Sequence, residues 1–266
     1  MSESAKTGQP KNSRCDTIYE GLAEKALKLR QQTFEAFVEL GEAHLGGSFS
    51  IIELLITLYE KVIKEEDKFI LSKAHASFPY CLLLREKGYN LPITTHLEIN
   101  PENGIYCTTG SLGHGLPLGT GMALGRKLQK KPGNVYVMMS DGECQEGTTW
   151  ESFLIAARHK LDNLVVLIDY NKIQALSPLN EALPLDDLSA KFKAFNWKCS
   201  EVHDGHSFDE LIPVLQQHND EAKPRAVIVH TTKGKGIKAF ENDPVWHARK
   251  IKGEELEIGK KELGIV

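Results

Sequence analysis

Near the start of the chain, apolar positions recur at the spacing of one helix face. After a polar stretch over residues 1–14, Ile18, Leu22, Leu29 and the cluster 34–38 follow one another at helical spacing. Periodicity of this kind is typical of an amphipathic helix, and a short polar terminal stretch is typical of a flexible tail. The pattern therefore predicts a tail over residues 1–14 followed by one long helix.

A second helix is predicted directly after a glycine-rich interruption. The run Gly46-Gly47-Ser48 breaks the first pattern, and Ser50 is followed three residues later by Glu53, which is the spacing of a capping box. The apolar residues Leu54, Leu55 and Leu58 would then continue the new helix. We expect the two helices to form an α-hairpin.

Beyond this hairpin, short apolar runs alternate with helical patterns. The runs are 69–71, 135–139, 164–168 and 226–229, with 198–202 as a weaker candidate, and the helical stretches are 119–130, 150–160, 185–195 and 208–217. This alternation is typical of βαβ units, whose parallel strands are buried on both faces. Residues 15–266 are therefore predicted to form a single α/β domain, a doubly wound, mostly parallel sheet with helices on both faces.

Composition and charge narrow the function classes. The 266 residues are 41% hydrophobic and 26% charged, and the net charge of −4 gives no general attraction to nucleic acid. There is no apolar run long enough for a membrane helix, and the polar N-terminus lacks a secretory signal, so we expect a cytoplasmic protein. The five cysteines form no Cys-x-x-Cys pair, which indicates buried small residues rather than disulfides or a cysteine-based zinc site.

Candidate chemistry lies where the predicted strands end, because ligands of such sheets bind beyond the carboxyl ends of the strands. Asp141 follows one apolar run and Asn171 follows the next, thirty positions later (171 minus 141), about the length of one strand-helix-strand unit. Carboxylate and amide oxygens suit Mg²⁺ or Ca²⁺. Gly142 would allow a phosphate to approach the backbone. An Asp-Gly pair alone is more often an ordinary polar turn, but its spacing to Asn171 favours a metal site.

The segment from Ser140 to Ile173 resembles the thiamine diphosphate signature, and the chain resembles the cofactor-binding N-terminal half of transketolase over residues 17–250. The motifs that carry this resemblance are AHLGGS (43–48), LSKAHA (71–76), TTGSLGHG (108–115), SDGECQEG (140–147), DGH (204–206) and KGKG (233–236) with Trp246 and His247. Their order and spacing make the match specific.

The resemblance implies a role for each matching residue. Asp141, Asn171 and the backbone oxygen of Ile173 would bind the divalent cation, Mg²⁺ or alternatively Ca²⁺ or Mn²⁺. The diphosphate and thiazolium groups of the cofactor would be surrounded by Gly142, Gly110, Leu112, His75, Lys233 and His247. Buried cations, imidazoles and backbone N–H groups suit a ligand that bears a diphosphate.

The same resemblance places His44, His75 and His247 along a substrate channel, where histidine is suited to proton transfer near neutral pH. His96 would be a further catalytic residue, although it lacks the family's Gly-His-Pro context. By contrast, His159, His203 and His218 are interpreted as surface or structural residues. Two departures from the family pattern are Ser140 in place of a glycine and His114 in place of a glutamine. Ser140 is acceptable if its backbone angles are ordinary.

The resemblance also implies a partner. In the family, a glutamate that activates the cofactor belongs to a second, pyrimidine-binding domain, and after His247 we find only a charged tail to Val266. We therefore expect a separately encoded C-terminal subunit, an α2β2 assembly and activity only in that complex. Glu146 matches a glutamate near the interface in the family, but it could equally be an acid favoured by a helix N-terminus. The expected reaction transfers a two-carbon ketol unit from a ketose or ketose phosphate to an aldehyde or ketone.

Other functions remain open at this stage. The α subunit of a thiamine-dependent 2-oxoacid dehydrogenase also carries an Asp-Gly to Asn metal motif, but the turn 108–113 and the pair His44 and His75 favour transketolase. A binding-only paralogue would keep the fold without turnover, and the complete set of metal and histidine residues argues against it. A nicotinamide-binding protein is disfavoured because there is no Gly-x-Gly-x-x-Gly after the first strand.

Overall fold

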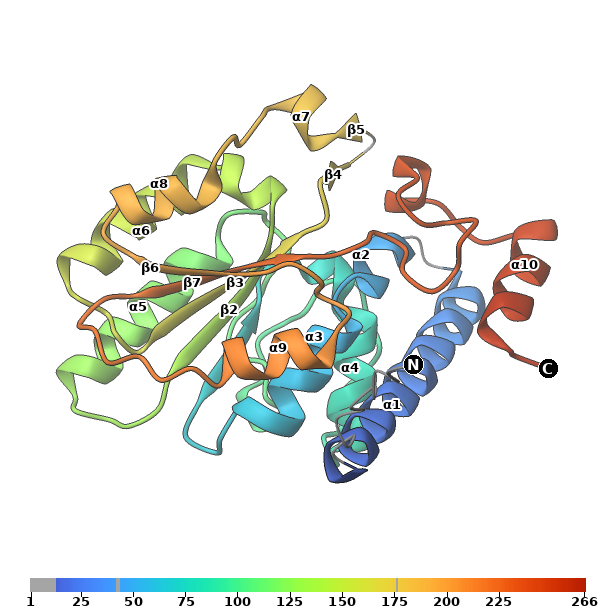
Figure 1. Cartoon of the computed structure of the whole chain (residues 1–266), viewed down its shortest axis with the longest axis horizontal. Coiled ribbons are helices and arrows are strands. Elements are labelled where there is room, and N and C mark those ends of the chain that lie inside the picture. Colours follow the sequence, from blue (N-terminus) through green and yellow to red (C-terminus); the bar gives the residue numbers. More distant parts are fainter. Residues whose placement is uncertain (1–12, 42–43, 176) are drawn as a thin grey trace, which may run out of the picture.

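A parallel five-stranded sheet forms the centre of the molecule in the computed structural model, which describes residues 13–41, 44–175 and 177–266 (Figure 1). Its strands lie in the order β1-β2-β3-β7-β6, and a small antiparallel pair, β4 and β5, stands apart from them. The strands are β1 (Lys68–Leu71), β2 (Val135–Ser140), β3 (Leu164–Tyr170), β4 (Ile173–Gln174), β5 (Ser177–Pro178), β6 (Lys198–Val202) and β7 (Arg225–His230). All five strands predicted from the apolar runs are present, including the weak candidate.

Helices cover both faces of the sheet, as expected for a doubly wound fold. They are α1 (Ser13–Leu40), α2 (Leu45–Phe49), α3 (Ile52–Thr57), α4 (Ser77–Glu86), α5 (Gly115–Leu128), α6 (Gly147–Arg158), α7 (Leu179–Ala182), α8 (Leu188–Ala194), α9 (Phe208–Leu215) and α10 (Glu254–Leu263). Short 3-10 turns cover Ala74–Ala76, Pro101–Asn103, Gly142–Gln145 and Pro244–His247, and a π-helical turn covers Leu58–Val62. Two apolar cores result, one beneath α1, α3, α4 and α9 and the other beneath α5, α6 and α8 (Figure 1).

The side chains of each strand point alternately to the two faces of the sheet, and this explains the two cores. In β2, Tyr136 and Met138 belong to the first core, whereas Val135, Val137 and Met139 belong to the second. Successive side chains of a strand point to opposite faces, so a strand covered on both sides is apolar throughout. Because all five strands are parallel, their carboxyl ends lie at one edge of the sheet, and the register pairs Ser140 at the end of β2 with Asp169 near the end of β3. This edge carries the predicted site.

The predicted capping box is wrong. The residue that precedes α3 is Ile51, and it makes no side-chain cap. The Ser50 hydroxyl instead donates to the Gly47 carbonyl at 3.0 Å and to Asp169 Oδ2 at 2.7 Å, while Glu53 accepts a hydrogen bond from Arg30 at 2.7 Å. Buried tertiary partners thus replace the local cap. The run 46–48, expected to interrupt the first helix, instead lies inside the separate short buried helix α2, and α1 already ends at Leu40.

The ends of the chain also differ from expectation. Residues 1–12 of the predicted tail lie outside the described residues, and α1 begins at Ser13. The segment after His247, expected to be only a charged tail, contains helix α10. A Cβ on Gly259 would lie 2.4 Å from the Phe34 ring, so α10 packs closely on α1. Within the described part of the chain, no helix combines the length and apolar character that crossing a membrane requires.

Candidate active site

The predicted cation ligands line one pocket at the carboxyl ends of β2 and β3. Asp141, Asn171 and Ile173 all border this pocket. Asp141 is buried, and its two oxygens accept backbone hydrogen bonds from Gly142 at 2.8 Å and from Lys172 at 2.7 Å. Each carboxylate oxygen keeps a further lone pair that could bind a cation. The structure therefore brings together the residues that the signature selected.

Asn171 is held in one orientation by its neighbours. Its Nδ2 atom donates to Asp169 Oδ2 at 3.0 Å, and its Oδ1 atom accepts from the Ile173 backbone N–H at 3.1 Å. The Ile173 carbonyl, expected to bind the cation, accepts a hydrogen bond from Lys233 Nζ at 3.0 Å. A carbonyl oxygen has two lone pairs, so it can accept this bond and still face a cation.

A buried ion pair that sequence reasoning did not single out supports these ligands. The side chains of Lys73 and Asp169 are 1% and 0% exposed and form a salt bridge. Lys73 also donates to the Gly47 carbonyl at 3.1 Å, and Asp169 additionally accepts hydrogen bonds from Ser50 and Thr231. Burial alone would raise the pKa of Asp169, but Lys73 holds it below its ordinary value. Lys73 lies two positions after the apolar run 69–71, and Asp169 directly follows the run 164–168. A charged residue in such a place is the sequence signal that could have identified this pair.

Three histidines from distant parts of the sequence meet beside this pocket. The ring centroids of His44, His75 and His247 lie 5.5 to 5.6 Å apart, so the three rings form one cluster. His44 immediately precedes α2, His75 lies in the turn before α4, and His247 lies in the turn before α10. His247 Nδ1 is 3.1 Å from Lys233 Nζ, whose ammonium also donates to the Ile173 carbonyl, so the cluster adjoins the predicted cation ligands.

The charges in the pocket favour an anionic ligand that binds together with a metal cation. Burial, together with the Asp169 charge, raises the pKa of Asp141 to about 6. Burial and the charge of Lys73 lower the pKa of Lys233 to about 8. Burial and neighbouring lysines also lower the pKa of His75, and that of His247 to about 3, so both rings are neutral at neutral pH. A bound cation would stabilise the Asp141 carboxylate, and a bound anion would stabilise the ammonium of Lys233.

The loop that contains Gly110 and Leu112 forms another part of the site. Leu112 lines the pocket, whereas Gly110 has φ +143° and lies against His96. A Cβ on Gly110 would approach His96 Cδ2 to 2.6 Å, so a larger residue would displace this exposed histidine. His96 is thus placed beside the Gly110 loop, not in the histidine cluster.

Buried Glu143 joins this loop to the end of β2, and sequence reasoning did not single it out. It accepts hydrogen bonds from the backbone N–H groups of Gly113 at 3.1 Å and Ser140 at 2.8 Å, and from the Ser72 hydroxyl. Ser140 is not among the residues with positive φ, so the condition under which it can replace the family's glycine is met. Glu146 is exposed and precedes α6 without making a side-chain cap. Its interface role stays a prediction.

The residues present fit a diphosphate with a divalent cation. Asp141, Asn171 and the Ile173 carbonyl supply hard oxygen ligands, and Lys233 supplies a buried positive charge. Gln174 Oε1, also at this pocket, is buried with no hydrogen-bond partner among the described residues. An unpaired buried acceptor costs free energy unless a ligand or water satisfies it. The pocket is therefore built for a polar ligand.

Known proteins resemble this chain over most of its length. The family model described as the transketolase thiamine diphosphate binding domain matches residues 26–266. The 6-deoxy-6-sulfo-D-fructose transketolase subunit SqwG of Clostridium sp. (strain MSTE9) is 34% identical, covering 91% of this chain and 96% of that protein. An apulose-4-phosphate transketolase subunit of Actinobacillus succinogenes is also 34% identical, covering 92% of this chain and 96% of its own length.

Solved transketolases share the fold. The enzyme from Campylobacter jejuni superposes with a TM-score of 0.78 at 25% identity, covering 91% of this chain and 42% of that one. The enzyme from Leishmania mexicana superposes with a TM-score of 0.81 at 20% identity. At this low identity, the match shows that the two proteins share a fold and nothing further. The chain thus spans about two fifths of the length of these solved enzymes, but nearly the whole length of the two transketolase subunits.

These matches confirm the resemblance to the N-terminal part of transketolase and the predicted parallel α/β fold. They favour transketolase over the 2-oxoacid dehydrogenase and nicotinamide-binding alternatives, since the relatives described above are transketolases or their subunits. The chain therefore belongs to the transketolase thiamine diphosphate-binding domain family, as a transketolase-type transferase subunit that corresponds to the N-terminal part of the enzyme.

Proposed function

We propose that this chain binds thiamine diphosphate with a divalent cation and, together with a partner subunit, transfers a two-carbon ketol unit. The donor would be a ketose or ketose phosphate, and the acceptor an aldehyde or ketone. One observation carries the proposal: Asp141, Asn171 and Ile173 line a single pocket that also holds Lys233 and His247. Oxygen ligands for a cation thus lie next to groups that attract an anion.

In this proposal the cation is Mg²⁺, with Ca²⁺ or Mn²⁺ as alternatives. Asp141, Asn171 and the carbonyl of Ile173 would hold it, since hard cations take carboxylate, amide and carbonyl oxygens. The raised pKa of Asp141 supports this assignment, because a buried carboxylate that lacks a paired cation holds its proton more tightly. The Lys73–Asp169 pair would keep the Asn171 amide in position.

The remaining groups of the pocket would bind the cofactor itself. The diphosphate and thiazolium groups would be surrounded by Lys233, His75, His247, Gly110, Leu112 and the backbone at Gly142. When bound, thiamine diphosphate supplies a carbon nucleophile that also accepts the electron pair released by ketose cleavage. The chain's own residues would orient the substrate hydroxyls and move their protons.

The three clustered histidines suit proton movement. A neutral imidazole has one donor nitrogen and one acceptor nitrogen, so it can accept a hydroxyl proton and return it later. His75 and His247 are both held neutral by burial and nearby positive charge, and His44 lies beside them. We assign catalytic roles to these three, and a substrate-side role to His96 at the neighbouring loop.

A separately encoded subunit with a pyrimidine-binding domain would complete the enzyme, in an α2β2 assembly where Glu146 lies near the interface. The names of the relatives, transketolase subunits for sulfofructose and for apulose 4-phosphate, support a subunit organisation and sugar or sugar-phosphate substrates in carbohydrate metabolism. The location proposed for the enzyme is the cytoplasm.

Calorimetry tests the cofactor site directly. Thiamine diphosphate is titrated into the chain with Mg²⁺ or with a chelator, and ketol transfer is then assayed with the partner subunit present. Asp141→Asn should weaken Mg²⁺-dependent binding by more than about tenfold, as expected when a metal ligand loses its charge. The matched control Asp209→Asn, at an exposed position on α9, should bind like the wild type. Undiminished affinity in Asp141→Asn would refute the assignment, and cofactor binding without ketol transfer would favour a binding-only paralogue.

A further inference from the structure

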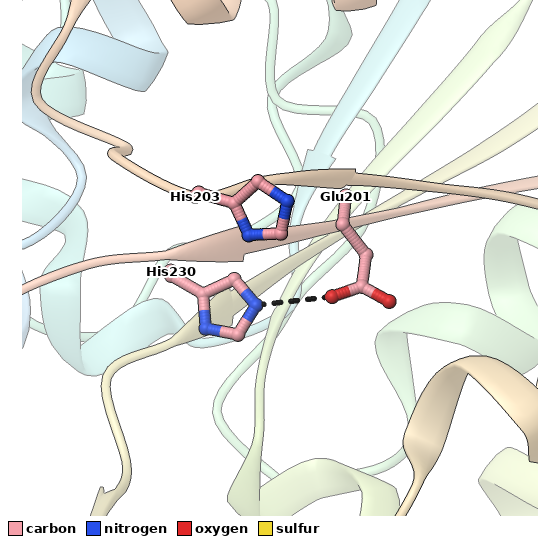
Figure 2. Close-up of side chains that lie close together, drawn as sticks. All are labelled: Glu201, His203 and His230. Atoms are coloured by element: carbon pink, nitrogen blue, oxygen red, sulfur yellow. Dashed lines mark hydrogen bonds and ion pairs between the residues drawn. The ribbon is translucent and has the colours of Figure 1, made fainter.

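A second group of potential metal ligands lies at the ends of β6 and β7. Glu201, His203 and His230 each offer one ligand atom, and these three atoms lie within 4.8 Å of one another. Figure 2 shows the two imidazole rings side by side, with the Glu201 carboxylate directed toward His230. None of the three residues lines the pocket that holds Asp141 and Lys233. The group is therefore separate from the proposed cofactor site.

Strand register explains why these residues meet. In the parallel pairing of β6 with β7, Glu201 lies opposite Ile228 and Val202 lies opposite Val229. The next pair in the same register is His203 with His230, just beyond the end of β6. Glu201 and His203 are two positions apart, so the pleat directs both side chains to the same face of the sheet. The backbone thus holds three ligand-bearing positions next to one another.

The ligand atoms of the three side chains are close enough to converge on one ion. His230 Nε2 lies 3.2 Å from Glu201 Oε2, and the centroids of the His203 and His230 rings are 5.8 Å apart at an interplanar angle of 24°. In tetrahedral zinc sites, bond lengths of about 2.1 Å place two ligand atoms about 3.4 Å apart and two imidazole centroids about 5 Å apart. Small side-chain rotations would therefore close the three ligands around one ion.

Exposure and ligand type favour a zinc-like ion. The side chains of Glu201 and His230 are 34% and 24% exposed, so an ion can enter from solvent and a water molecule can take the fourth position. Two imidazole nitrogens with one carboxylate oxygen suit Zn²⁺, whereas Mg²⁺ and Ca²⁺ prefer oxygen ligands alone.

We propose that Glu201, His203 and His230 form a binding site for a divalent transition metal ion of the zinc type, distinct from the cofactor cation. A bound ion would cross-link the ends of β6 and β7, and β6 is the last strand of the described sheet. His203 is exposed, as predicted for a surface residue, and the proposal adds a metal-binding role to it.

Zinc titration with localisation of the ion tests this proposal. Zinc chloride is titrated calorimetrically into the full chain in excess Mg²⁺, and crystals soaked in zinc are measured at the zinc absorption edge. We expect an anomalous peak between Glu201, His203 and His230. His203→Ala should weaken zinc binding by more than about tenfold, because mutation of a residue that only supports a metal ligand already reduces metal affinity by roughly that factor. His159→Ala changes an exposed histidine at the end of α6 and serves as the matched control.

A second variant separates loss of the site from loss of the fold. Glu201→Gln keeps the size of the side chain and removes its charge, so it should also weaken zinc binding while leaving the melting temperature of the zinc-free chain unchanged. Unaltered zinc affinity in both His203→Ala and Glu201→Gln would overturn the proposal. So would an anomalous peak found only at the histidine cluster of the candidate active site. Neither outcome bears on thiamine diphosphate binding, which is measured separately.

Discussion

Replacing Lys73 by methionine tests how strongly the buried ion pair supports the sheet edge. The change removes the ammonium from a pair whose side chains are 1% and 0% exposed, but keeps a long apolar side chain in its place. Asp169 would then be a buried carboxylate without its cation. Removing one partner from such a pair typically costs about 3–5 kcal/mol.

The contacts of Asp169 and Lys73 refine this magnitude. Asp169 would keep its hydrogen bonds from Ser50, Asn171 and Thr231, which favours the lower end of the range. The Gly47 carbonyl would lose its bond from Lys73 Nζ, which adds about 1 kcal/mol. We therefore expect the free energy of unfolding to fall by about 4 kcal/mol.

Urea unfolding followed by circular dichroism measures this loss. Lys131→Met, at an exposed lysine, is the matched control and should change the free energy of unfolding by less than about 0.5 kcal/mol. Adding Asp169→Asn to Lys73→Met should recover part of the loss, because the uncompensated charge is then removed. If Lys73→Met lowers the free energy of unfolding by less than about 1 kcal/mol, the buried pair of Lys73 and Asp169 does not stabilise the fold to the expected extent.

Two further predictions concern the fold around the site. Burial alone would raise the pKa of Glu53, but Arg30 and His206 lower it from 4.5 to about 2. The charged Glu53 side chain therefore stabilises the fold at a pH above its unfolded pKa, and this stabilisation is lost as the pH falls toward 2. Urea titrations should show a higher free energy of unfolding for the wild type than for Glu53→Gln, and this difference should decrease by about 2 kcal/mol from pH 6 to pH 3. A difference that does not change with pH would contradict this prediction. Gly110→Ala should destabilise the chain by about 1–3 kcal/mol, because φ is +143° and His96 is adjacent. Gly121→Ala, in an open helical position on α5, should instead stabilise it by about 0.5–1 kcal/mol in the same assay, and equal effects of the two changes would argue against backbone strain.

The sequence was sufficient for the five strands of the main sheet, though not for the small pair β4 and β5, and for placing Asp141 and Asn171 at one edge. Apolar runs buried on both faces stand out in any chain, and parallel strands necessarily end at one edge. The histidine cluster, in contrast, followed only from resemblance to a family. Residues at positions 44, 75 and 247 meet through tertiary packing, which periodicity does not reveal.

Local signals failed where buried charges had tertiary partners. Ser50 and Glu53 have the spacing of a capping box, yet each is engaged by a distant group, Asp169 and Arg30 respectively. A hydrogen bond made in a dry interior outweighs an exposed cap, so the local pattern was misleading. The pair of Lys73 with Asp169 was missed for the same reason, because spacing along the chain does not show which buried charges meet.

The histidine cluster joins segments that lie far apart along the polypeptide, and this affects the order in which parts of the pocket can form during synthesis. The strand tips that carry Asp141 and Asn171 are complete once the middle of the chain has been translated. His247, by contrast, lies 76 positions beyond Asn171 (247 minus 171), so it emerges from the ribosome later. A nascent chain could thus bring Asp141 and Asn171 to one edge of the sheet before His247 can join the other two histidines.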